Sequence, residues 1–347
     1  MLTKKAPYLI VQIKGTNKTP KPSLPDWAPE NKGERKQMAV NVLTPTIDMT
    51  RAQWLEARRR GIGGSDAAAI AGLNRWRSPV TVWLDKTGQI VPEEPGEAAY
   101  WGIVLEDLVA QEFVKRTGKK VRRRNAILQH PEHPFMLANV DRLVVGENAG
   151  LECKTSSEYR KQEWGEDGET LPPEYLIQVQ HYMAVTGYDS WYLAVLIGGN
   201  KFIHFRVDRD QELIDYLIKI ESDFWKLVED GTPPPMDGSD ASKELLSRLY
   251  PKSNNEAIEL PKNALELIEE REHWAEQEKL MAEKKQEAEN KLKQLLGDNE
   301  VGWAGERKVT WKTVTSNRLD TKKLQEEHPH IYAKYVKESS YRRFSIK

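Results

Sequence analysis

The stretch DRLVVGENAGLECK, from Asp141 to Lys154, contains two runs rich in apolar residues separated by a glycine-bounded turn. Apolar runs that flank a short polar segment with Gly and Asn are typical of a β-hairpin. We therefore expect one strand from Phe135 to Val145, a turn over residues 146–150, and a second strand from Leu151 to Thr155.

The polar residues of this hairpin predict a reaction centre. Successive side chains of a strand point to opposite faces, so Glu152 and Lys154 should share one face while Cys153 takes the other. Asp141, on the preceding strand, would lie beside them, and two converging carboxylates with the Cys153 carbonyl suit Mg²⁺ or Mn²⁺. Such an ion activates water for phosphodiester hydrolysis, and Lys154 would orient or deprotonate that water. An acid and a lysine two positions apart are more often a solvated ion pair, so the surrounding sequence must decide.

Elements on either side of the hairpin indicate the fold class. The spacing of an amphipathic helix packed on a core occurs at Trp101, Leu105, Leu108, Val109 and Phe113. Periodicity and the positions of Pro and Gly predict a helix over residues 172–186, strands over 191–197 and 202–207, and a helix over 210–228. This order predicts an α/β (α+β) protein with a mixed central β-sheet flanked by helices.

The rest of the chain divides by composition. Residues 1–45 mix Lys, Pro, Asn and Gly without a sustained period, which predicts a disordered N-terminal arm. We expect the main domain over residues 46–230, a Pro-rich linker over 231–238, and a charged, mainly helical extension over 239–347. The extension should contain a long charged helix over 258–296 with an irregular apolar seam, a hairpin over 303–313, a short helix and a final strand.

Composition limits the class of protein. Of the 347 residues, 39% are hydrophobic and 30% are charged, which suits a packed core inside a hydrated surface. No run approaches the ~18 apolar residues of a membrane span, and we expect a soluble, cytoplasmic protein without a signal peptide. The single cysteine, Cys153, excludes an internal disulfide and a cysteine-based zinc site. It is predicted to be a buried apolar residue and not a nucleophile.

Positive charge is concentrated although the net charge is only -1. KRTGKKVRRR, from Lys115 to Arg124, carries seven basic residues and no acid, and a second basic run covers residues 58–60. These runs are consistent with a phosphate-binding face, and charge alone does not separate that from a solvated surface. The loop GIGGSD that follows the second run precedes an alanine-rich helix, which Ser65 is predicted to cap.

Three motifs together resemble a known nuclease superfamily. D-x10-E-C-K, which starts at Asp141, is preceded by G-x-x-x-E at Gly102 and Glu106 and followed by Q-x-x-x-Y at Gln178 and Tyr182. This combination resembles the PD-(D/E)XK superfamily, although a valine precedes the aspartate here. Within it, RRRGIGGSDAAAIAGLNRWRSPVTVWLDKTG, residues 58–88, is similar to the N-terminal signature of the YqaJ viral recombinase family, relatives of the phage lambda exonuclease.

The resemblance spans roughly residues 50–227 and implies a restriction-endonuclease-like core. It assigns metal binding to two carboxylates and one carbonyl, and action on the nucleophilic water to the lysine. A further acid would be auxiliary, as a ligand of a second metal ion. The matching positions are Asp141, Glu152, Cys153 (backbone carbonyl), Lys154 and Glu106.

The resemblance also implies a set of DNA-binding residues. In lambda-type exonucleases an arginine and a serine hold the 5′ phosphate, and Arg58 and Ser65 have the comparable spacing here, with Arg60 as a competitor for Arg58. Gln178 and Tyr182, four residues apart on one helical face, match positions that border the active site.

The expected activity is that of a Mg²⁺-dependent exonuclease of phage-type recombination. It would digest linear double-stranded DNA from free ends, 5′ to 3′, in the bacterial host cytoplasm and leave 3′ overhangs for a single-strand annealing protein. The resemblance to lambda-type exonucleases also implies a homo-oligomer in the form of a ring-shaped trimer. The alternatives are an endonuclease of the same fold and a non-catalytic DNA-binding adaptor. A trimming nuclease with an iron–sulfur cluster needs more cysteines, and a P-loop needs a lysine that the glycine loop lacks.

Overall fold

The computed structural model describes residues 40–90, 96–165, 168–254 and 256–346. The described residues fall into two compact units, one within residues 40–74 and 82–234 and the other within residues 75–81 and 235–346. Most of the predicted disordered arm, residues 1–39, lies outside the described residues.

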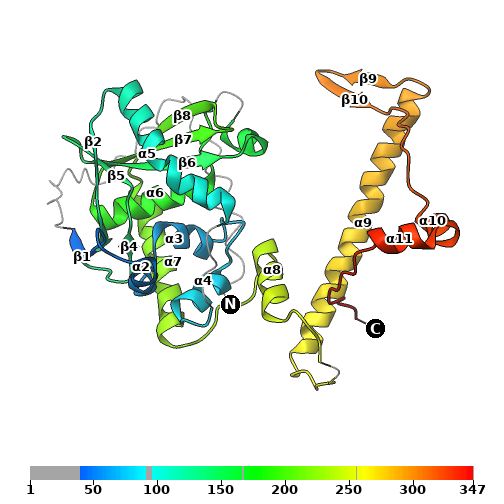
Figure 1. Ribbon diagram of the computed structural model, residues 1–347, viewed down its shortest axis with the longest axis horizontal. Helices are drawn as coiled ribbons and strands as arrows, with labels where there is room; N and C mark the ends of the chain where they lie inside the picture. The colour runs from blue at the N-terminus through cyan, green and yellow to red at the C-terminus, as the bar shows by residue number, and fades with distance from the viewer. Residues whose placement is uncertain (1–39, 91–95, 166–167, 255, 347) are drawn as a thin grey trace, which may run out of the picture. The chain divides into compact units, whose positions relative to one another are not determined.

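A five-stranded sheet forms the centre of the first unit (Figure 1). Its strands, in spatial order, are β2 (Val121–Arg123), β5 (Arg142–Val144), β6 (Ala149–Ser156), β7 (Ser190–Ile197) and β8 (Lys201–Asp208). β6 pairs antiparallel with β5 and parallel with β7, which in turn pairs antiparallel with β8. The prediction of a mixed central sheet flanked by helices is therefore confirmed.

Helices cover both faces of this sheet (Figure 1). α5 (Glu97–Thr117) contributes Val109, Ala110 and Phe113 to a core with Leu151 and Cys153 of β6. On the opposite face, α6 (Pro173–Thr186) and α7 (Gln211–Glu229) pack on the large apolar residues of β7. Leu151 and Cys153 thus point towards α5, and strand alternation turns Glu152 and Lys154 towards α6.

The prediction that one apolar face of α5 packs on the core is wrong in part. Trp101 is 48% exposed and Leu108 is 53% exposed, whereas Val109 and Phe113 are buried. The helix runs from Glu97 to Thr117 and buries side chains only over its C-terminal half, where it lies against β6 and β7. The N-terminal half still approaches the end of β6, because a Cβ atom on Gly102 would lie 3.7 Å from Thr155 Oγ1.

The strand expected from Phe135 to Val145 is interrupted. β4 (Leu137–Ala138) ends before Asn139, and β5 begins only at Arg142. The two short strands belong to different sheets. β4 joins a second, antiparallel sheet with β3 (Ala126–Gln129) and β1 (Asn41–Pro45). Asp141 consequently occupies the crossing between sheets and not a strand.

β1 also corrects the predicted N-terminal boundary. Residues 41–45 were expected to belong to the disordered arm, yet Asn41–Pro45 pairs antiparallel with β3. The β-branched residues Val42 and Thr44 suit a strand, and Leu43 packs beside the buried Ile127 and Leu137.

Three short helices precede α5. α2 (Arg51–Arg59) starts with a capping box, in which Thr50 accepts from Gln53 N–H and the Gln53 side chain accepts from Thr50 N–H. α3 (Gly64–Ile70) follows, and α4 (Pro79–Lys86) comes next. The prediction that Ser65 caps α3 is wrong, because Gly63 is the N-cap residue and the Asp66 carboxylate accepts its N–H at 3.1 Å.

The second unit is mainly helical, with α8 (Asp240–Leu249), α9 (Ala264–Leu296), α10 (Thr321–Glu327) and α11 (Pro329–Tyr335). β9 (Val301–Ala304) and β10 (Arg307–Thr310) form its antiparallel hairpin. The expected final strand is absent from residues 336–346, which have no strand partner in the described chain. None of the helices in the described ranges combines the length and apolar character needed to span a bilayer.

Candidate active site

Asp141 is fixed to the central strand by a backbone contact. The N–H of Cys153 donates a hydrogen bond of 2.8 Å to Asp141 Oδ2. Asp141 immediately precedes β5, which pairs with β6, so the short turn between the two strands brings this carboxylate to the residues at the middle of β6. The aspartate and the Glu152–Lys154 segment are therefore neighbours in space.

Glu152 is 3% exposed and is held by residues of two elements. Its Oε1 atom lies 2.6 Å from the ammonium of Lys154 and accepts a 2.7 Å hydrogen bond from Gln178 Nε2. Gln178 also donates to the Tyr182 hydroxyl at 2.8 Å, so one amide connects two residues of α6 to the acid on β6. Charge-assisted contacts of this kind fix an acid's orientation.

The electrostatics of the cluster show uncompensated negative charge. Desolvation, followed by the charges of Glu152 and Glu106, raises the pKa of Asp141 well above its usual range. Burial acts to lower the pKa of Lys154, yet the negative charges of Glu152 and Asp141 outweigh it and raise that pKa overall. The single positive charge of Lys154 therefore does not neutralise the negative charges of the carboxylates around it.

Two observations indicate that these residues could bind a divalent cation. Within the described chain, no hydrogen-bond partner reaches the buried Oε2 atom of Glu152, a position where a carboxylate oxygen normally has one. A cation bound beside Asp141 would also offset the burial and the Glu152 and Glu106 charges that raise the pKa of this aspartate. No three His, Cys, Asp or Glu side chains of the described ranges could hold an ion among themselves. Two carboxylates, a backbone carbonyl and water form a set that Mg²⁺ accepts.

Glu106 approaches the cluster but is engaged by an arginine. Arg142 is 4% exposed and its Nη1 atom lies 2.6 Å from Glu106 Oε1, while its Nη2 atom lies 3.0 Å from Asp107 Oδ1. Arg142 also donates to the carbonyl oxygen of Asp141 at 2.7 Å. Arg142 was not predicted as a site residue, and its place next to Asp141 in the sequence was the available signal.

A hollow of about 370 Å³ opens beside these groups. It is lined by most of the residues that the sequence analysis singled out. Those residues are Arg58, Ser65, Glu106, Asp141, Lys154, Gln178 and Tyr182. Arg60 lies apart from them, in a second hollow with residues of β1 and the start of α2, so it does not share a site with Ser65.

Arg58 is placed in the hollow by three neighbours. Its guanidinium carbon lies 4.7 Å from the centre of the Trp54 ring, one helical turn earlier in α2. Its Nη2 atom donates to Ser65 Oγ at 3.5 Å and lies 3.8 Å from Asp66 Oδ2. Trp54 was not predicted as a site residue, although its spacing of four from Arg58 puts both on one helix face.

The basic run of residues 115–124 reaches the site through its last members. Arg123 and Arg124, together with Asn125, line the same hollow as Asp141. Arg123 also lies 3.0 Å from Asp107 Oδ1. Positive side chains thus flank one side of an acidic centre, an arrangement that suits a phosphate-bearing ligand.

Cys153 and His181 lie near the site but are buried in the fold. Cys153 is 8% exposed, and burial together with the nearby Asp141 and Glu152 charges raises the pKa of its thiol. His181 is fully buried, with Nε2 2.8 Å from the Leu137 carbonyl and Nδ1 2.8 Å from Glu221. Neither side chain lines the hollow.

Comparison with known proteins places the chain in a family. The YqaJ-like viral recombinase domain matches residues 53–189. The uncharacterized protein YqaJ of Bacillus subtilis (strain 168) is 50% identical over 313 residues, which covers 89% of this chain and 98% of that protein. The chain belongs to the YqaJ-like viral recombinase family, and the resemblance inferred from its motifs is confirmed.

Solved structures give weaker likenesses. An alkaline exonuclease (LHK-Exo) from Laribacter hongkongensis superposes with a TM-score of 0.45 at 20% identity, covering 57% of this chain and 97% of that one. A phage-related exonuclease from Haemophilus somnus 129PT superposes with a TM-score of 0.37 at 14% identity, covering 50% and 96% respectively.

Proposed function

We propose that this protein is a metal-dependent exonuclease that hydrolyses linear double-stranded DNA from its ends, 5′ to 3′, and leaves 3′ single-stranded overhangs. The observation that carries the proposal is the shared hollow: Asp141 and Lys154 line it together with Arg58. An acidic centre with a lysine suits phosphodiester hydrolysis, and an arginine beside it suits a phosphate group. Membership of a viral recombinase family agrees with a role in recombination.

The metal would be Mg²⁺, or Mn²⁺, held by the carboxylates of Asp141 and Glu152 and the Cys153 carbonyl. When bound, the ion supplies Lewis acidity for water and for the scissile phosphate. The Cys153 N–H orients Asp141, and Gln178 orients Glu152. Lys154 would hold the nucleophilic water and meet negative charge that develops on the phosphate.

Recognition of the DNA end would fall to Arg58 and Ser65. Arg58 Nη2 and Ser65 Oγ are 3.5 Å apart, so one phosphate could contact both. Gln178 and Tyr182 would border the scissile nucleotide from α6. Such a terminal phosphate site in the same hollow as the acids favours digestion from ends over internal cutting.

The wider context is part of the proposal. A single-strand annealing protein would receive the 3′ overhang, and a ring-shaped trimer would retain the duplex between cuts. The bacterial host cytoplasm would be the place of action, and residues 46–230 would form the nuclease domain, with residues 239–347 as an extension.

A digestion assay tests this function. Linear 5′-phosphorylated duplex and covalently closed circles would be incubated with Mg²⁺ and the wild-type chain, Asp141→Ala or Lys154→Ala. We expect the linear DNA to be shortened from its 5′ ends by the wild-type chain only. Cutting of circles would favour an endonuclease, and binding of DNA without cutting by the wild-type chain would favour a non-catalytic adaptor.

A further inference from the structure

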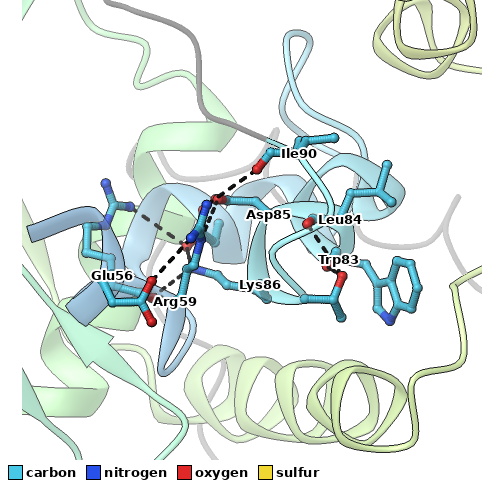
Figure 2. Close-up of polar contacts among 10 residues, drawn as sticks. Glu56, Arg59, Trp83, Leu84, Asp85, Lys86 and Ile90 are labelled. Carbon is cyan, nitrogen blue, oxygen red and sulfur yellow. Dashed lines mark hydrogen bonds and ion pairs between the residues drawn. The ribbon is translucent and has the colours of Figure 1, made fainter. Parts of the chain in front are cut away.

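α2 and α4 are joined by an exchange of polar contacts, and Figure 2 shows the residues that make it. From α4, the Lys86 ammonium donates to the carbonyl oxygen of Arg58 at 3.0 Å. From α2, Arg59 lies 3.8 Å from Asp85 and donates to the carbonyl oxygen of Ile90 at 3.4 Å. The helix that carries Arg58 is thereby fixed at its C-terminal end.

The Lys86 contact continues to the first turn of α3. Lys86 Nζ lies 2.7 Å from Asp66 Oδ2, and the two side chains are 2% and 0% exposed. The same Asp66 oxygen accepts the Gly63 N–H at 3.1 Å and lies 3.8 Å from Arg58 Nη2. One buried carboxylate oxygen therefore joins α4, the loop before α3, and the Arg58 guanidinium.

Stability gives no sufficient reason for such a pair. A buried ion pair is often matched or exceeded in stability by apolar residues of similar volume, because desolvation offsets the Coulomb attraction. What the pair does provide is a fixed geometry. Lys86 holds the main chain of Arg58, and Asp66 holds its guanidinium beside Ser65, the neighbouring residue in α3.

We propose that Lys86 and Asp66 are positioning residues that hold Arg58 and Ser65 at the spacing needed to bind one terminal 5′ phosphate. This inference rests on the proposed function, in which Arg58 and Ser65 contact that phosphate. The buried pair itself lies behind the site: neither Lys86 nor Asp66 lines the hollow. Their contribution is to affinity for the phosphorylated end and not to the hydrolytic step.

The contact between Arg59 and Asp85 provides a matched control. It joins the same two helices, but its side chains are 26% and 19% exposed, and Arg59 has no contact with Ser65 or Asp66 among those the structure gives for it. Arg59→Gln therefore weakens the attachment of α2 to α4 without altering the groups that hold the Arg58 guanidinium.

The test measures binding and cleavage separately. Affinity for duplexes with a 5′ phosphate or a 5′ hydroxyl would be measured by fluorescence anisotropy in EDTA, and digestion of both would then be measured with Mg²⁺. In the double variant Asp66→Asn with Lys86→Met, both charges are lost, and the amide oxygen of the introduced asparagine can still accept the Gly63 N–H. We expect the preference for the phosphorylated end to fall about tenfold, with affinity for the hydroxyl end within about twofold of wild type.

Asp66→Asn alone is the second variant if the double variant does not fold. Burial, which outweighs the attraction of Asp66, lowers the pKa of Lys86, so loss of the Asp66 charge disfavours the buried ammonium further. The same loss of end preference is expected. Arg59→Gln should keep the wild-type preference.

The outcomes separate this inference from the proposed function. A folded variant that keeps the wild-type preference, or loses affinity for both ends equally, overturns the positioning role. A wild-type chain that prefers the phosphorylated end but digests neither duplex would refute the nuclease activity and leave the positioning role in place. A wild-type chain without any end preference would overturn both end recognition and this inference.

Discussion

The backbone N–H of Cys153 donates to the carboxylate of Asp141 across the junction between β5 and β6. This bond holds an acid whose pKa is raised by desolvation and by the charges of Glu152 and Glu106. The aspartate is thus oriented by the fold and at the same time disfavoured as an anion. Sites arranged for metal binding often carry this conflict between geometry and charge.

Asp141→Asn should stabilise the metal-free protein and abolish cleavage. A neutral amide removes the repulsion from Glu152 and Glu106, so we expect the thermal midpoint in EDTA to rise by about 2 °C or more. Mg²⁺ should raise the midpoint of the wild-type chain and leave that of the variant unchanged, since only a competent site is linked to folding. Differential scanning fluorimetry with and without Mg²⁺ measures both effects. Equal Mg²⁺ shifts in the two proteins would contradict a metal site at Asp141.

Lys154→Met should reduce the rate of cleavage by about a hundredfold or more, the range for loss of an acid–base or charge-stabilising group. Binding of the DNA duplex in EDTA should stay within about threefold of wild type, because the role proposed for the lysine is in the hydrolytic step and not in holding the duplex. Methionine keeps the apolar stem of the side chain but loses the contact of the Lys154 ammonium with the Tyr175 ring, 5.3 Å from the ring centre. A fall in affinity that matches the fall in rate would argue for a binding role instead.

Glu106 and Asp107 form a natural pair for comparison, since both contact Arg142. Glu106 lines the hollow, whereas Asp107 is half exposed and also contacts Arg123. We expect Glu106→Gln to lower the cleavage rate about tenfold or more and Asp107→Asn to change it by less than about twofold. Single-turnover rates on one duplex substrate give the comparison. Equal losses would mean that both acids act only by fixing Arg142.

The buried pair of His181 and Glu221 should make stability depend on pH. Burial lowers the pKa of His181, but the Glu221 charge and hydrogen bond outweigh it and raise that pKa overall; burial raises the pKa of Glu221 as well. The folded pair therefore keeps a proton that the unfolded chain releases, so its contribution is complete below about pH 6.5 and is lost as the pH rises through the raised pKa of His181.

Glu221→Gln removes the charge that raises the pKa of His181, so the stability of this variant should depend less on pH. Urea midpoints at pH 6, 7, 8 and 9 would be measured for both proteins and their difference taken at each pH, which cancels titrations elsewhere in the chain. The difference should shrink as the pH rises. A difference that is constant across this range would show that the pair carries no extra proton in the fold.

The mixed sheet could be predicted because β7 is strongly apolar and ends at the Gly198–Gly199 turn before β8. It missed the break at Asn139–Asp141, since residues 135–145 read as one continuous run; only tertiary pairing assigns β4 and β5 to separate sheets. The resemblance to lambda-type exonucleases paired Arg58 with Ser65 but could not exclude Arg60. That choice depends on the turn after α2, which directs Arg60 to a different hollow.

Buried polar partners were the hardest to foresee. Arg142, Lys86 and Asp66 look like ordinary surface charges in the sequence, because their burial follows from elements far apart along the chain. Gln178 was suggested by a motif, yet its contact with Glu152 depends on α6 crossing the face of β6. Long-range packing decides these roles, and one-dimensional patterns do not contain it.

Because β6 pairs in parallel with β7, the central sheet can form only after β7 has been synthesised. β6 carries Glu152 and Lys154, but the strand beside it is separated by α6 and is synthesised more than thirty residues later. Until Ser190–Ile197 leaves the ribosome, β6 has an unpaired edge, and such edges readily join other chains. The strand that carries Glu152 and Lys154 therefore waits for its partner while residues 157–189 are synthesised, and we expect slower translation of this segment to lower the yield of folded protein.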